Sequence, residues 1–142
     1  MTEEEVSGFL ADQLTVSCAT VGPGGRPHLV PLWYFVAGDE LRAWTYAKSQ
    51  KAKNLERDRR ATLLVEDGVA YDELRGVMLE CDVEFVRGEE LIELAVSLFD
   101  RYAGRGPEIR AMIEAQAPKR IGLRFRPTRV VSWDHRKLGG AY

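Results

Sequence analysis

Alternating hydrophobic and polar positions recur along most of this chain and predict a protein built mainly from β-strands. The clearest case is the segment 74–86, in which every second residue from Val77 to Phe85 is apolar. Alternation over that length indicates a strand with one face buried and the other in water. Similar patterns predict six further strands at 13–21, 26–36, 40–46, 61–66, 119–126 and 129–133.

Four other segments place apolar residues three or four positions apart, which is typical of helices. They cover residues 3–11, 48–58, 89–102 and 108–116, and Ser49 is placed to cap the second of them. Adjacent strands separated by short turns dominate the order, which does not fit a doubly wound parallel sheet. The pattern favours one mainly β domain over 1–142: a small barrel of six or seven antiparallel strands with helices outside.

Composition narrows the class of protein. Hydrophobic residues make up 45% and charged residues 30%, as in ordinary globular proteins. The longest apolar run, 29–37, contains Pro31 and is far shorter than the roughly 20 residues of a membrane helix. The chain opens with Glu3, Glu4 and Glu5 rather than a signal peptide, so we expect a cytoplasmic protein without a membrane partner.

Charge is distributed unevenly. The net charge of −2 argues against a general nucleic-acid binder. The segment 48–60 nevertheless carries a local charge of +4, because two acids accompany six basic residues, Lys48, Lys51, Lys53, Arg57, Arg59 and Arg60. An electropositive segment inside an acidic chain indicates an anionic ligand; the alternative is a solvated basic helix face in a structural or regulatory dimer.

The start of the basic helix suits a phosphate. Free N–H groups and a partial positive charge gather at a helix N-terminus, and lysines add full charges. Lys51 and Asn54 are three residues apart and so share one helix face. The aromatic strand 40–46, with Trp44 and Thr45, comes directly before them. Together these features predict a ligand with a flat ring and a phosphate tail, which describes a flavin.

Other familiar sites are excluded. A strand follows Gly22-Pro23-Gly24-Gly25, whereas a dinucleotide-binding loop must open a helix. Cysteines and histidines are scattered over the chain, so we expect no metal site. Asp134 and His135 are neighbours on a predicted strand, where they would point to opposite faces rather than form part of a catalytic triad. Each tryptophan, taken alone, fits core packing.

The chain resembles the pyridoxamine 5′-phosphate oxidase-like split β-barrels, and most of all the short flavin- or deazaflavin-dependent oxidoreductases among them. The resemblance covers nearly the whole domain. It is carried by Thr20-Val21, Gly25-Arg26-Pro27, Pro31-Leu32-Trp33-Tyr34, Lys51-Ala52-Lys53-Asn54-Leu55, Asp58-Arg59-Arg60-Ala61 and Val131-Ser132-Trp133-Asp134.

This resemblance implies a six-stranded split barrel that works as a homodimer, with two cofactor sites across the subunit interface. By the resemblance, Lys51 and Asn54 hold the phosphate with Ser49 nearby, and the end of the last strand, around Trp133, approaches the second subunit. The ring would lie against Pro31, Leu32 and Trp33 and against Trp44 and Thr45. Members use FMN or the deazaflavin F420, and some bind haem.

Our leading hypothesis is an oxidoreductase that moves a hydride between F420, or alternatively FMN, and a small planar or unsaturated acceptor. Lys53 could also meet the anionic tail of F420, and Tyr34 and His135 are the candidate proton donors. The alternative is a flavin- or haem-binding homodimer without turnover, in which His28 or His135 would be the haem ligand.

Overall fold

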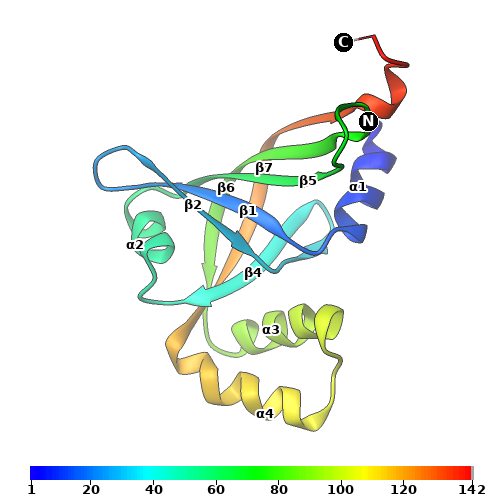
Figure 1. The fold of residues 1–142 in the computed structure, drawn as a ribbon. Coiled ribbons are helices and arrows are strands. Elements are labelled where there is room, and N and C mark those ends of the chain that lie inside the picture. The colour runs from blue at the N-terminus through cyan, green and yellow to red at the C-terminus, as the bar shows by residue number, and fades with distance from the viewer. Residues whose placement is uncertain (142) are drawn as a thin grey trace.

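A computed structural model describes residues 1–141 and contains one curved sheet of seven antiparallel strands (Figure 1). The order across the sheet is β2-β1-β5-β6-β7-β4-β3. Every neighbouring pair is antiparallel, which confirms the mainly β fold. The strands are β1 (Val16–Val21), β2 (Pro27–Leu32), β3 (Phe35–Ala37), β4 (Glu40–Tyr46), β5 (Arg60–Asp67), β6 (Arg75–Val86) and β7 (Arg120–Asp134).

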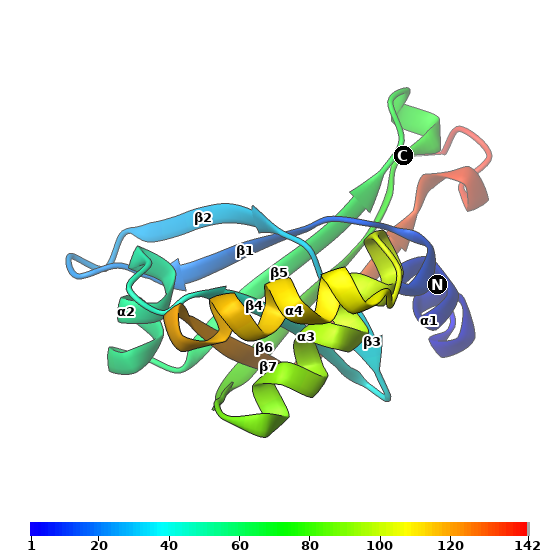
Figure 2. The same ribbon diagram turned by 90° about the horizontal axis from the view of Figure 1, so that it is seen from below.

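Four α-helices lie around this sheet. Seen from below, α3 and α4 form a hairpin that covers one end of it (Figure 2). Thr2 and Glu5 form a capping box at the start of α1, and the hydroxyl of Ser49 caps α2 as predicted. The helices are α1 (Glu3–Asp12), α2 (Gln50–Arg57), α3 (Glu89–Tyr102) and α4 (Pro107–Gln116), with short 3₁₀ turns η1 (Tyr71–Glu73), η2 (Ala117–Lys119) and η3 (His135–Lys137).

The sheet curls into a barrel that stays open along one seam. Its edge strands are β2 and β3, and they are not paired with each other in the order of the sheet. Because β3 pairs only with residues 40–42 of β4, the rest of β4 has a partner on one side alone, strand β7. This arrangement confirms the predicted split barrel of antiparallel strands, and α2 lies beside the opening (Figure 1).

The segment predicted as one strand, 26–36, is broken into β2 and β3 at Trp33 and Tyr34. Tyr34 turns into the core, where its side chain is fully buried and its hydroxyl donates to the carbonyl oxygen of Leu10 at 2.6 Å. Its neighbour Trp33 stays 48% exposed. The chain therefore leaves the outer edge of the sheet here and crosses the seam.

The two strands predicted at 119–126 and 129–133 are in fact the single strand β7. Pro127 pairs with Cys81 and Arg129 with Glu80, so Thr128 is left over as a bulge. A bulge bends a strand without ending it. Pro127 and Thr128 therefore mark a bend in β7 rather than the turn that their composition indicates.

Inward-facing residues of the strands, together with Phe9, Leu10 and Leu55 from the helices, form one hydrophobic core. A smaller cluster joins Val86 to Leu91 and Leu94 of α3, with Phe35 and Trp44 packed against it. Within residues 1–141, no helix is long and apolar enough to cross a membrane.

Candidate functional site

Lys51, in the first turn of α2, is turned into the protein. Its side chain is only 6% exposed, and its ammonium donates to the hydroxyl of Thr45 on β4 at 2.8 Å. The alternative of a fully solvated basic helix face is therefore wrong for this residue, although Lys48 and Lys53 are exposed. Thr45 lies on the inner face of β4 and Trp44 on the outer face, as alternation along a strand requires.

No carboxylate compensates the charge of Lys51 within the described part of the chain, where its ammonium donates to the neutral hydroxyl of Thr45. Burial lowers the pKa of this ammonium, and the nearby guanidinium of Arg120 on β7 lowers it further. A buried cation is costly unless an anion pairs with it. Lys51 is therefore a candidate anion-binding residue, and Arg120 is near enough on β7 to add to the positive charge there.

Arg120 was not identified from the sequence, because nothing near it in the chain indicates a site. The register of the sheet brings it there: Arg120 pairs with Tyr46, the last residue of β4. Its guanidinium stacks over the ring of Trp44 at 5.1 Å and donates to Gln116. Arg120 also lines a cavity of about 280 Å³ beside α2, together with Ala47 and Arg87.

Asn54 is fully buried, which explains an otherwise unfavourable residue within a helix. Its Nδ2 donates to the hydroxyl of Thr20 on β1 at 3.0 Å. Its Oδ1 accepts from Gln50 and from Arg57, each at 2.7 Å. Lys51 thus joins α2 to β4 on one side of the seam, and Asn54 joins it to β1 on the other.

His28 on β2 provides an unsatisfied polar atom in the same region. It stands opposite Thr20 in the register of β1 and β2, and paired residues of two strands share one face. Its Nδ1 is buried and has no hydrogen-bond partner among the described residues. This orphaned nitrogen and the uncompensated cation of Lys51 fit an anionic group with hydrogen-bonding atoms.

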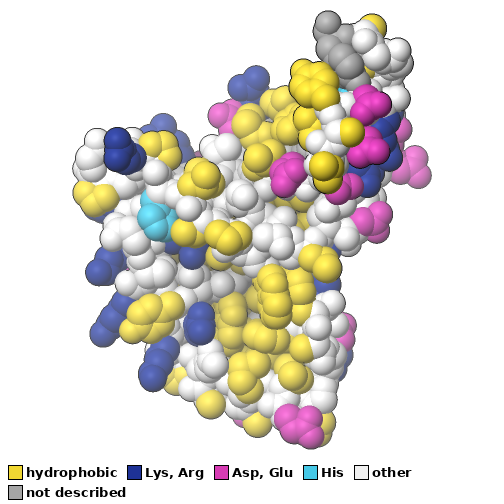
Figure 3. Space-filling view, viewed as in Figure 1, with side chains coloured by type: hydrophobic (Ala, Val, Ile, Leu, Met, Phe, Trp, Pro, Cys, Tyr) yellow, Lys and Arg dark blue, Asp and Glu magenta, His cyan; other side chains and the backbone are white. Residues whose placement is uncertain are grey.

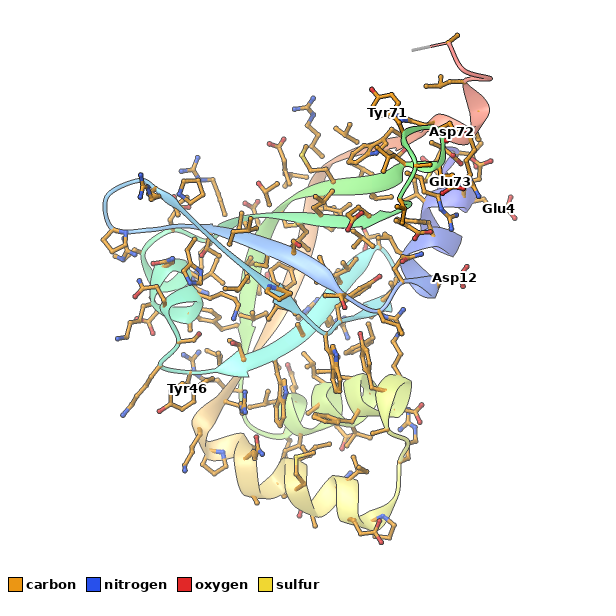
Figure 4. The ribbon with its side chains drawn as sticks, viewed as in Figure 1. Glu4, Asp12, Tyr46, Tyr71, Asp72 and Glu73 are labelled. Carbon is orange, nitrogen blue, oxygen red and sulfur yellow. The ribbon has the colours of Figure 1, made fainter. Side chains whose placement is uncertain are left out.

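Positive and negative side chains lie on different parts of the surface. Lys and Arg side chains follow the edge of the molecule at α2, and Asp and Glu side chains gather at the end where the termini lie (Figure 3). The labelled acids Glu4, Asp72 and Glu73 lie at that end, and Tyr46 lies at the other (Figure 4). Such a field steers an anion toward α2.

The aromatic residues of the predicted site form a connected group. Trp33 contacts Phe99 of α3 at 6.0 Å between ring centroids, and Phe99 contacts Trp44 at 5.6 Å. Leu32 packs partly against the core and Pro31 is exposed on the edge strand β2. Trp33 and Trp44 therefore both pack against α3, on the outer side of β4, whereas Thr45 lies on the inner face of that strand.

Three predicted residues lie elsewhere or are committed to other contacts. Trp133 is half-buried and pairs with Gly76. His135 contacts Tyr71. Tyr71 lies at the end of the molecule opposite Tyr46 (Figure 4). Within one chain, neither is near Lys51. The buried hydroxyl of Tyr34 donates to a carbonyl oxygen, and burial raises its pKa. The prediction that His135 lies on a strand is wrong, because this residue begins the 3₁₀ turn η3.

The cysteines lack the properties of a reactive site. Cys18 and Cys81 are both buried, and desolvation raises the pKa of each to about 12. Thiols in this state behave as small apolar side chains. Within residues 1–141, no group of three or more histidine, cysteine or acidic side chains is arranged to hold a metal ion.

A family model described as pyridoxamine 5′-phosphate oxidase matches residues 2–134. The chain belongs to this family. Comparison with curated proteins gave no match. A conserved hypothetical protein from Mycobacterium tuberculosis is 44% identical with a TM-score of 0.91, and the match covers 100% of this chain and 90% of that one.

An F420 reductase of solved structure is 26% identical with a TM-score of 0.68, over 88% of this chain and 94% of that one. A haem storage protein from Vibrio cholerae shares the fold at 16% identity and a TM-score of 0.74, over 93% of each chain. The family and the F420 reductase support binding of a flavin-type cofactor.

Proposed function

We propose that this protein is an oxidoreductase that moves a hydride between bound F420 and a small planar or unsaturated acceptor, with FMN as the alternative cofactor. The observation that carries the proposal is the buried ammonium of Lys51, which lacks a carboxylate among the described residues. Family membership and the similarity to an F420 reductase agree with it.

The donor set matches the anionic part of such a cofactor. The ammonium of Lys51 has three N–H donors, and the hydroxyl of Thr45 accepts from one of them. Arg120 adds a planar guanidinium, the group best suited to phosphate oxygens. We assign phosphate binding to Lys51, Arg120 and Asn54. The exposed Lys53 is assigned to the outer part of the anionic tail.

A bound deazaflavin or flavin supplies the hydride chemistry itself. This chain binds and orients the cofactor: Trp33 and Trp44 offer aromatic surface to its ring, and the covering helices exclude water. Tyr34 holds its hydroxyl proton on the carbonyl oxygen of Leu10, so it is not poised to protonate a substrate. Of the two predicted donors, His135 remains the candidate, contributed by the second subunit.

We further propose that the active species is a homodimer. The outer face of β2 carries Leu29, which is 66% exposed, and a cavity of about 360 Å³ lies between β1, β2 and β6. Large exposed apolar side chains beside a hollow are typical of interaction surfaces. A second chain on this face would also provide the far end of β7, with Trp133 and His135, that a single chain keeps away from Lys51.

Titration of the purified protein with F420 and with FMN tests the cofactor assignment. Lys51→Met should weaken binding about 10- to 100-fold, because it removes a charge-assisted contact of about 1.5–3 kcal/mol. Arg105→Met, which removes an exposed charge from the loop between α3 and α4, is the control and should change affinity by less than about threefold. Failure of both cofactors to bind at micromolar concentration would refute the proposal.

A flavin- or haem-binding dimer without turnover is the second candidate, and His28 favours it. A buried imidazole nitrogen without a hydrogen bond is available as a ligand to iron. Hemin titration should then give a Soret band that His28→Ala removes and His135→Ala leaves unchanged. Oxidation of reduced F420 that requires both this protein and an acceptor would instead establish turnover.

A further inference from the structure

The corner between β2 and β3 is held in place by the end of α3. Trp33 and Tyr34 form this corner, and the side chains of Arg101 and Tyr102 reach it from a helix nearly 70 positions away. Neither residue belongs to the motifs by which the sequence indicates a cofactor site. Their contacts are nevertheless the densest set of hydrogen bonds from any two adjacent side chains described.

Arg101 ties the backbone of the corner, at Tyr34, to the end of α1. Its guanidinium donates to the carbonyl oxygens of Tyr34 and Ala11, each at 2.6 Å, and also to those of Leu10 and Gln13. It thereby caps the carbonyl end of α1 while holding Tyr34, and it stacks over the Tyr34 ring at 4.7 Å.

Tyr102 holds the corner and the indole of Trp33 together. Its hydroxyl accepts from the backbone N–H of Tyr34 at 3.0 Å and lies within hydrogen-bond distance of the carbonyl oxygens of Leu14 and Tyr34. Its ring is stacked on Trp33, with centroids 4.1 Å apart and planes only 2° from parallel. The hydroxyl bonds fix the ring, and the ring fixes the indole.

Trp33 is left with one open face. Tyr102 covers one face and Phe99 approaches the edge, at 6.0 Å and 74°. Trp33 is still 48% exposed, so the exposed area is mainly on the face opposite Tyr102. Phe99 also contacts Trp44, which adjoins Thr45, the acceptor of the Lys51 ammonium. The aromatic group and the cation are thus held by neighbouring residues of β4, on opposite faces of that strand.

We propose that Tyr102 is a positioning residue that presents the open face of Trp33 as a platform on which the planar ring of the coenzyme stacks. Arg101 supports it by holding the backbone of Tyr34. The inference rests on the proposed function, because it supplies the ring-binding half of a site whose anion-binding half is Lys51. A side chain fixed before binding loses less entropy when a ring stacks on it, so this arrangement favours affinity.

Three variants of the full-length protein test the proposal: Tyr102→Leu, Tyr102→Phe and Trp33→Leu. Affinity for F420 and FMN is measured by titration, together with the visible circular dichroism of the bound coenzyme. Tyr102→Leu and Trp33→Leu should each weaken binding about 5- to 10-fold and reduce the dichroism, as expected for the loss of one aromatic stack. Tyr102→Phe keeps the ring but loses the hydroxyl bonds that fix it, so its affinity should fall between those of the unchanged protein and Tyr102→Leu.

A second measurement, made without coenzyme, follows the position of Trp33 itself. Near-ultraviolet circular dichroism should lose a Trp33 signal in Tyr102→Leu and retain it in Tyr102→Phe. Unchanged affinity and dichroism in Tyr102→Leu would overturn the inference. If the unchanged protein binds neither coenzyme, the proposed function fails, whereas binding that is insensitive to Tyr102 refutes the platform alone.

Discussion

Asn54 donates a hydrogen bond from its side-chain amide to the hydroxyl of Thr20 at 3.0 Å, and both side chains are buried. Three residues earlier on the same helix, Lys51 donates to Thr45. Thr20 and Thr45 belong to β1 and β4, which lie on opposite sides of the open seam. Helix α2 therefore joins the two sides of the barrel through two side chains, where no backbone ladder does.

We expect Asn54→Ala to lower the free energy of unfolding by about 1–3 kcal/mol, because it removes the bond to Thr20 and leaves that buried hydroxyl unpaired. Denaturant unfolding of the apoprotein measures the change. Lys53→Ala, at the next position and exposed, is the control and should stay within about 0.5 kcal/mol of the unchanged protein. Equal effects of the two substitutions would contradict a joining role for Asn54.

Lys51 should make stability rise with pH in the alkaline range. Burial lowers its pKa below the ordinary value of 10.5, so the folded protein loses this proton before the unfolded chain does. The unfolded state then binds this proton more tightly, and the contribution of Lys51 to the free energy of unfolding increases until about pH 10.5. The buried thiols of Cys18 and Cys81 act in the opposite direction above about pH 9, because burial raises their pKa from 9.0 to about 12 and the unfolded chain loses their protons first.

The comparison of the unchanged protein with Lys51→Met isolates this effect from other lysines. Lys51→Met should be equally or more stable at pH 7, because an apolar side chain replaces a buried unpaired charge. The difference should narrow as the pH approaches 10.5. If the difference in free energy of unfolding does not vary between pH 7 and 10.5, burial does not lower the pKa of Lys51.

Gly76→Ala should lower the free energy of unfolding by about 1–3 kcal/mol, because the added methyl group overpacks the contact with Trp133. A Cβ at this position would overlap Cζ2 of that ring. Thermal unfolding checks this, with Gly24→Ala as the control, since nothing lies within 4 Å of a Cβ there. Trp133→Ala in the Gly76→Ala background should relieve the clash; if it does not, Trp133 is not the cause.

Asp134 should contribute stability that is lost in acid. Its hydrogen bond from Arg136 lowers the pKa of the carboxyl to about 2, from the ordinary 3.8, so the contribution is complete above pH 3.8 and disappears as the pH falls toward 2. Asp134→Asn should therefore cost about 1 kcal/mol at pH 7 and little at pH 2. Denaturant unfolding at the two pH values measures both differences, and equal differences would contradict a stabilising role for the bond from Arg136.

Leu29→Arg should shift the protein from dimer to monomer if the outer face of β2 lies in the proposed interface. A charge buried in an apolar contact without a partner destabilises association by several kcal/mol. Light scattering after size exclusion measures the mass of the species. Val69→Arg, on the loop before η1 and 97% exposed, provides the control. If the Leu29→Arg variant remains a dimer, the interface lies elsewhere.

Local patterns predicted the regular elements well. The strand 40–46 and the helix 89–102 have the predicted bounds, because alternation and helical spacing are set by neighbouring residues. The break at Trp33 and Tyr34 was missed for the opposite reason. It depends on Arg101 and Tyr102, which come from α3, and no short-range pattern in 26–36 records their presence.

The candidate site could be predicted in part. Lys51 and Asn54 were recognisable from charge and spacing at the start of a helix, but their burial was not, because it depends on Thr45 and Thr20 on two different strands. Arg120 is brought in only by the register of β4 with β7. Its role follows from sheet topology, which local sequence leaves open.

The edge strand β2 begins with Pro27 and contains Pro31, two residues that have no backbone N–H to offer. Its exposed margin is therefore a poor template for another strand, whether from the opposite side of the barrel or from a neighbouring molecule. The same two prolines hinder closure of the barrel by backbone hydrogen bonds between its edge strands. Side chains of α2 bridge the opening instead.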